Sequence, residues 1–117
     1  MAHFYDLAFA EIPNITPLQD NDRKNSSHHI YVVSIDFEKI GISRNKFMKK
    51  LAEQGVGSQV HYIPVVSQPY YQDMGYKIEQ YPLTIKYYQN TLSIPLYYGL
   101  SNSDQKLVVS SIKRLLQ

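Results

Sequence analysis

The chain has 117 residues, 12 Lys and Arg against 10 Asp and Glu, a net charge of +2 and no cysteine. This length predicts one domain, and 44% hydrophobic with 19% charged residues predicts a globular fold. So small a charge does not favour nucleic acid or an acidic membrane, and the lack of cysteine excludes disulfides, thiolate catalysis and cysteine-based zinc sites.

The spacing of hydrophobic residues, with the proline, glycine and capping residues that begin or end elements, predicts helices and strands in alternation. In chain order they predict a helix over 2–12, a strand over 29–37, a helix over 44–54, a strand over 58–63, a helix over 82–91, an extended piece over 92–99 and a helix over 102–116. A single helical turn is allowed between 65 and 76. The order predicts an α+β domain in which helices cover a short antiparallel sheet.

The N-terminal segment has apolar residues at helical spacing, and Pro13 ends the predicted helix. Because no capping residue precedes it, residues 1–13 are interpreted as the remnant of a helix that links two domains. Pro17 keeps the next segment extended. The polar residues 19–28 are expected to form a flexible loop.

Helix ends carry clear capping residues further along. Ser43 is expected to cap the helix over 44–54, and Gly55 suits its left-handed end. Pro82 suits the first turn of the helix that follows it. Ser101 and Asp104 have the spacing of a capping box for the last helix.

No apolar run approaches the ~20 residues that span a membrane. The segment MAHFYDLAFAEI carries Asp6 and Glu11 and lacks the basic start of a signal peptide. The expectation is therefore a cytoplasmic protein without membrane or nucleic-acid partners.

Four kinds of chemistry are weighed and set aside. S-x-x-K spacings at 43–46 and 110–113 lack their companion motifs, and GVG at 55–57 follows a helix, the wrong order for a phosphate loop. Aromatic residues on the predicted strands lack the consensus of an RNA-binding sheet. A metal site is not expected, because no two histidines have helical ligand spacing; the histidines are His3, His28, His29 and His61.

His61 and Tyr62 lie in the stretch GSQVHYIPVVSQPYYQDMGY, residues 57–76, and two interpretations stay open. Alternation along a strand makes Tyr62 a core residue and His61 a partly buried, hydrogen-bonded neighbour. Alternatively, the end of the strand and the loop form one wall of a ligand site, with aromatic groups and a few polar tips.

The blocks SSHHIYVVSI, RNKFMKKLAEQGVGSQVHYIPVVSQPYY and YYQNTLSIPLYYGLSNSDQKLVVSSIKRLL carry a resemblance over residues 26–117. They resemble the C-terminal small domain of the DegT/DnrJ/EryC1/StrS sugar aminotransferases. Within the family, they most resemble the branch that makes UDP-4-amino-4,6-dideoxy sugars. The resemblance implies the small domain of the aspartate-aminotransferase fold, fold type I, in a dimeric enzyme dependent on pyridoxal phosphate (PLP).

Members of this family transfer an amino group, usually from glutamate, to a keto sugar nucleotide, here a 4-keto-6-deoxy UDP-sugar. Their large domain supplies the lysine that bonds PLP, and neither that lysine segment nor the aspartate that pairs with the PLP ring nitrogen is found here. None of the nine lysines has a suitable context. The chain alone is therefore expected to bind no PLP and to be inactive.

The resemblance also implies roles for particular residues. His61 and Tyr62 are the candidate substrate-binding residues, and the segment from Gln68 to Tyr71 is expected to shape the site by packing. The expected partners are a large PLP-binding domain or subunit and, weakly, a sugar nucleotide. An exposed apolar face, where the large domain would dock and through which a second copy could also pair, is expected on the first helix around Phe4, Tyr5 and Phe9. The alternative is a stand-alone module that binds a sugar nucleotide or a protein without chemistry.

Overall fold

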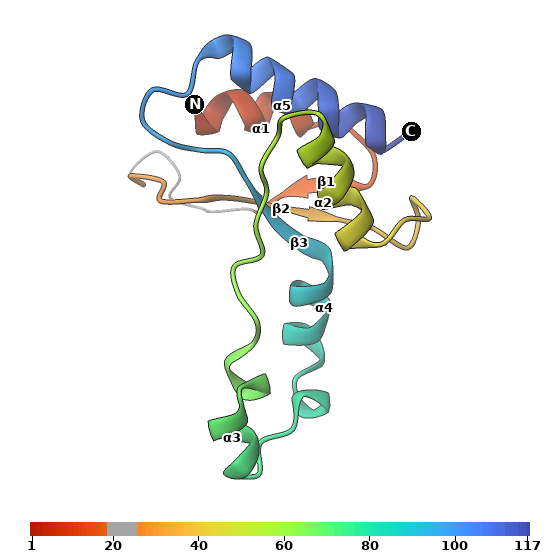
Figure 1. Cartoon of the computed structure of the whole chain (residues 1–117), viewed down its shortest axis with the longest axis vertical. Coiled ribbons are helices and arrows are strands. Elements are labelled where there is room, and N and C mark those ends of the chain that lie inside the picture. The colour runs from red at the N-terminus through yellow and green to blue at the C-terminus, as the bar shows by residue number, and fades with distance from the viewer. Residues whose placement is uncertain (19–25) are drawn as a thin grey trace.

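The computed structural model describes residues 1–18 and 26–117 (Figure 1). Most of the predicted loop, residues 19–25 of 19–28, lies outside the described residues. The elements are α1 (Ala2–Phe9), β1 (Ile15–Pro17), β2 (Tyr31–Ile35), α2 (Arg44–Glu53), η2 (Val65–Ser67), α3 (Pro69–Asp73), η3 (Ile78–Gln80), α4 (Pro82–Asn90), β3 (Thr91–Ile94) and α5 (Asn102–Leu115).

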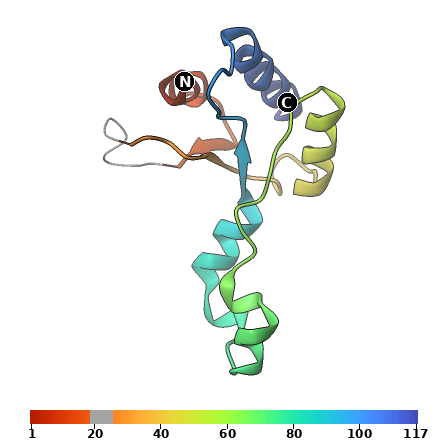
Figure 2. The same ribbon diagram turned by 60° about the vertical axis from the view of Figure 1, so that its left-hand side comes forward.

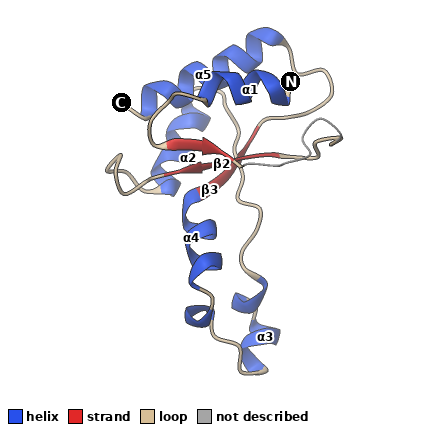
Figure 3. Ribbon diagram, turned by 180° about the vertical axis from the view of Figure 1, so that it is seen from behind, coloured by secondary structure: helices blue, strands red, loops and turns tan. Residues whose placement is uncertain are grey.

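The sheet is antiparallel, with the strand order β1-β2-β3. Ile15 pairs with Ile35 across β1 and β2, and Tyr31 pairs with Ile94 across β2 and β3. Helices α1 and α5 lie together over the sheet, with α2 beside α5 (Figures 1 and 3). The predicted α+β arrangement, a short antiparallel sheet covered by helices, is therefore confirmed.

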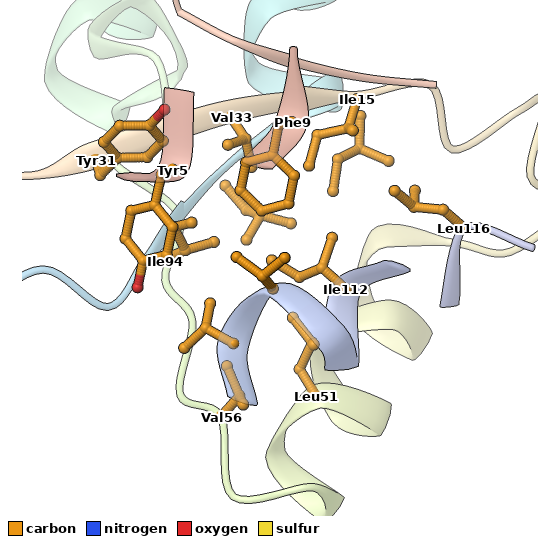
Figure 4. Packing of buried hydrophobic residues seen from close by; sticks show 14 of the residues in the cluster. Tyr5, Phe9, Ile15, Tyr31, Val33, Leu51, Val56, Ile94, Ile112 and Leu116 are labelled. Atoms are coloured by element: carbon orange, nitrogen blue, oxygen red, sulfur yellow. The ribbon is translucent and has the colours of Figure 1, made fainter. Parts of the chain in front are cut away.

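The core fills the space between the sheet and these helices (Figure 4). Along β2, Tyr31, Val33 and Ile35 are buried while the residues between them are only half-buried. The run of apolar residues from Ile30 to Val33 would suit a strand buried on both faces, but only the face that carries Tyr31, Val33 and Ile35 is covered by helices. Phe47 and Leu51 of α2 and Ile112 of α5 complete the same cluster.

Ser43 and Ser101 cap their helices as predicted. Ser43 Oγ accepts a hydrogen bond from the Lys46 amide at 3.3 Å, and Ser101 Oγ accepts one from the Asp104 amide at 3.1 Å. Each bond satisfies an amide that has no partner within its own helix. Gly55 follows α2 with φ +79°, the left-handed conformation expected there.

Three predictions about elements need correction. Residues 58–63 do not form a strand: Gln59 alone pairs with Ser93, as an isolated bridge, before the chain turns away at Pro64. The short strand β1 was not predicted, although the extended conformation expected around Pro17 is confirmed. Helix α1 ends at Phe9, about one turn before Pro13, since the turn to β1 begins there.

The expected apolar docking face on the first helix is also wrong. Tyr5 and Phe9 are buried, and Phe4 packs partly against the core. Figure 4 shows both buried rings directed into the cluster between the sheet and α5. The helix uses its apolar face for the chain's own core, so that face is not available to a partner.

The segment Val65–Asn90, here named the arm, projects away from the sheet and its covering helices (Figures 1 and 2). It holds α3 at its tip and α4 on its return, which confirms the predicted helix after Pro82 and the single turn before it. The molecule is correspondingly elongated, with extents of 48 × 35 × 24 Å.

Candidate functional site

The candidate site lies where the chain leaves the sheet and its covering helices, here called the body, to enter the arm. Gln59 and Ser93 exchange both backbone hydrogen bonds, at 3.1 and 2.7 Å, so the outgoing chain is fixed beside β3. Two residues further on, His61 reaches back to the same strand. A non-local pairing thus places the histidine, although no strand forms there.

His61 is half-buried, and its Nδ1 lies 2.7 Å from Ser93 Oγ. One of these two atoms donates to the other, which fixes the orientation of the imidazole ring. Tyr62 follows through a cis peptide bond, and its ring meets the His61 ring edge-on, with 4.7 Å between centroids. The Tyr62 side chain is 73% exposed, so the interpretation of Tyr62 as a core residue is wrong.

A groove of about 320 Å³ opens beside His61. One wall is β3 with the chain that follows it, and another is the segment after α2. Its lining combines apolar side chains with three hydroxyls, an amide and an imidazole; the residues are Ile30, Gly57, Ser58, Gln59, His61, Ser93, Ile94, Pro95, Leu96 and Tyr97. We call it the His61 groove. Such a mixture suits binding of an organic ligand with polar groups.

Helix α1 supports the far wall of this groove. The buried Tyr5 hydroxyl donates a hydrogen bond to the carbonyl of Pro95 at 2.9 Å. Burial raises the pKa of Tyr5 to about 12, because a phenolate would lose its hydration there. The phenol therefore stays neutral and keeps its proton for Pro95.

A second cavity of about 330 Å³ continues beyond Leu96 and Tyr97, which line both cavities. Its other walls come from the start of α1, from Ser27 and His28, and from the exposed Tyr98. Tyr97 therefore stands between two hollows of similar volume.

A third cavity, of about 290 Å³, is polar and lies between the sheet and α4. It contains Lys39 and Lys86, and Lys39 Nζ lies 3.2 Å from the Asp36 carboxylate. The hydrogen bond from the Lys39 amide lowers the pKa of Asp36, so this carboxyl group is ionised at neutral pH. Both lysines are exposed to solvent.

The three cavities described above do not fit PLP as a covalent cofactor. Neither cavity next to Tyr97 has a lysine in its lining, and the two lysines of the third cavity are hydrated rather than enclosed. A lysine that bonds PLP must be desolvated or otherwise activated as a nucleophile. None of these three cavities therefore encloses a lysine of that kind.

Other kinds of site are also missing from the part of the chain that the structure describes. No three His, Asp or Glu side chains there lie close enough together to hold a metal ion. None of its helices has the length and apolar character needed to cross a membrane.

The predicted site residues separate in the structure. His61 lines the groove, whereas Tyr62 lies outside the lining. The segment Gln68–Tyr71 belongs to the start of α3, at the tip of the arm, and does not shape the groove as expected. Sequence reasoning missed Ser93 and Tyr97, because only the pairing of Gln59 with Ser93 brings the two segments together.

Comparison with known proteins gives a consistent result. The profile of the DegT/DnrJ/EryC1/StrS aminotransferase family matches residues 1–113. The spore coat polysaccharide biosynthesis protein SpsC of Bacillus subtilis is 36% identical over 97% of this chain and 30% of its own length. The UDP-4-amino-4,6-dideoxy-N-acetyl-beta-L-altrosamine transaminase of Campylobacter jejuni is 27% identical over 100% of this chain and 31% of its own length.

The fold agrees with the sequence matches. The putative sugar aminotransferase Spr1654 of Streptococcus pneumoniae superposes with a TM-score of 0.84 and 28% identity, over 97% of this chain and 28% of that one. The same protein has been solved in apo, PMP and PLP forms. This chain spans about 30% of the length of the curated relatives that it matches.

Proposed function

Since this chain belongs to the DegT/DnrJ/EryC1/StrS aminotransferase family, we propose that it is the small domain of a PLP-dependent sugar-nucleotide aminotransferase. In this proposal it binds the sugar nucleotide in the His61 groove and does not transfer an amino group by itself. The observation that carries the proposal is the half-buried His61, held by Ser93 in the wall of a groove with mixed polar and apolar lining.

The groove has groups that suit a sugar nucleotide. The imidazole of His61, the amide of Gln59 and the hydroxyl of Ser93 can exchange hydrogen bonds with sugar hydroxyls or phosphate oxygens. The Tyr97 ring offers a flat surface for a sugar or a base. Tyr62 follows His61 outside the lining, and its exposed side chain is free to contact a ligand that extends beyond the groove.

The reaction needs a second component. PLP supplies the electron sink for amino transfer, and in this proposal a larger cofactor-binding part or subunit holds it. The described residues of this chain contribute substrate binding and orientation only. A 4-keto-6-deoxy UDP-sugar as acceptor, with glutamate as donor, is the finer proposal; similarity to the Campylobacter transaminase, whose name specifies a UDP-linked amino sugar, supports the UDP-sugar class.

The test is a titration of the ¹⁵N-labelled chain with UDP and with UDP-N-acetylglucosamine, followed by NMR. Expected shifts fall on groove residues such as Gln59, His61 and Tyr97. His61→Ala should weaken binding about tenfold, the value of one lost hydrogen bond of ~1.4 kcal/mol. His3→Ala, the same change at an exposed histidine of α1, should leave the affinity unchanged.

Absence of shifts in the groove at millimolar ligand would overturn the binding proposal. Addition of PLP gives a separate readout: no aldimine absorbance is expected from this chain. A stable, lysine-dependent aldimine band would contradict the assignment of PLP to another component.

A further inference from the structure

We infer that the arm, Val65–Asn90, is the surface through which this chain docks onto the cofactor-binding part of a sugar aminotransferase. The inference rests on the proposed function for the identity of the partner. The location of the surface rests on the described arm itself. The arm takes the place of the first helix, where the sequence had suggested an apolar docking face.

The arm buries none of its side chains. Every residue from Val65 to Asn90, all of them described, is at least partly exposed, including those of α3 and α4. Several are large and apolar: Leu83 is 83% exposed and Tyr70 is 69% exposed, and Val65, Met74, Tyr76 and Tyr87 are also exposed. Figures 1 and 2 show the arm standing clear of the helices that cover the sheet.

The composition of the arm matches that of a protein interface. It contains six of the eleven tyrosines of the chain, and its charged residues, Asp73, Lys77, Glu79 and Lys86, sum to zero. The centres of protein interfaces are enriched in tyrosine and methionine and depleted of charged residues. Tyrosine is also among the residues that most often dominate binding energy.

The arm is held in a defined position. The Arg44 guanidinium of α2 donates to the carbonyl of Tyr88 and, at 3.4 Å, to that of Thr91, and it lies 4.5 Å from the centroid of the Tyr88 ring. At the tip, the Tyr71 ring contacts those of Tyr70 and Tyr76, with centroids 5.3 and 6.1 Å apart. A surface that is ordered before binding loses less entropy on association, so an interface built on it is stronger.

The relatives indicate what covers this surface. This chain matches them over 97 to 100% of its own length but only 28 to 31% of theirs. In each relative, the matching unit is joined to a segment more than twice its size. A segment of that size has enough surface to cover the arm. The arm begins four residues after His61 and ends three residues before Ser93, so both of its ends join the segments that line the His61 groove.

A chimera tests the inference. This chain replaces the matching segment of the S. pneumoniae aminotransferase Spr1654, and hydrogen exchange is compared between the chimera and the isolated chain. Arm amides should exchange at least ~10-fold more slowly in the chimera, because the docked partner excludes water from them. Amides of α5 report folding in both proteins and should keep their protection.

Matched variants locate the contact. Leu83→Lys should abolish the added protection of the arm in the chimera, while leaving the thermal midpoint of the isolated chain within ~1 °C, since Leu83 is exposed there. Leu7→Lys makes the same change at a 67% exposed leucine of α1 and should leave arm protection intact. Equal exchange of the arm in chimera and isolated chain would overturn the inference.

A second copy of this chain is the competing occupant. Concentration-dependent dimerisation of the isolated chain, measured by sedimentation and lost in Leu83→Lys, would assign the arm to self-association and overturn the inference. Amino transfer by the chimera is measured separately. A chimera with a protected arm and no groove binding refutes the proposed function and keeps the docking inference. An active chimera with an unprotected arm refutes the docking inference and keeps the proposed function.

Discussion

Tyr5 illustrates how one residue connects the core to the candidate site. Its ring packs among aromatic neighbours, with the Tyr31 ring centroid 5.0 Å away, while its hydroxyl fixes the Pro95 carbonyl in the groove wall. Gln105 also interacts with this hydroxyl and partly offsets the effect of burial on the pKa of Tyr5. The residue therefore combines apolar burial with one satisfied polar group, as buried tyrosines usually do.

The raised pKa of Tyr5 predicts a loss of stability in alkali. The pKa rises from 10.0 to about 12 on folding, so the neutral phenol stabilises the native state fully below pH 10, and this contribution is lost as pH rises through 12. Urea unfolding at pH 8 and pH 11 should show a smaller loss in Tyr5→Phe than in wild type. Tyr98→Phe, at a fully exposed tyrosine, should behave as wild type. Equal losses in all three proteins would contradict the prediction.

Among the elements, helices were predictable wherever the signal is local. Ser43 and Ser101 marked the starts of α2 and α5, and Pro82 marked that of α4. The segment 58–63 has the alternation of a strand but pairs only at Gln59, because strand formation depends on a partner far away in sequence. The groove depends on that same pairing, so sequence identified His61 and not Ser93.

Arg44 is predicted to hold the last turn of α4 to the body. Arg44→Ala should speed amide exchange around Tyr88 to Thr91 about tenfold, because the guanidinium bonds and the stacked ring are lost. Arg44→Lys should not restore protection, since an ammonium group has no planar fork. Arg114→Ala, where the exposed guanidinium bonds Gln54, is the control and should leave α4 unchanged. Unaltered exchange in Arg44→Ala would show that other contacts hold the arm.

At the scale of the whole molecule, burial is divided unevenly. The buried cluster lies entirely in the sheet and in α1, α2 and α5 with their connections, and the arm contributes nothing to it. Local sequence signals predicted the arm helices but not their exposure. Their tyrosines and aliphatic residues are as apolar as those of the core, and only the three-dimensional path separates the two groups.

Two matched substitutions should show this division. Ile112→Val removes a methylene group from the core and should lower the free energy of unfolding by ~1 kcal/mol. Ile63→Val makes the same change at an exposed isoleucine where the arm begins and should change it by less than ~0.3 kcal/mol. Chemical denaturation of the two variants measures both values. Similar losses would mean that the arm and its base share the cooperative core.

The bridge between Gln59 and Ser93 couples the arm to the groove. Ser93 holds the backbone of the chain that enters the arm and also holds the imidazole in the groove. Thermodynamic reciprocity then applies: if the orientation of the arm alters the affinity of the groove, an occupied groove must favour one orientation by the same free energy. Docking and ligand binding would be two readouts of one equilibrium, with Ser93 as their common residue.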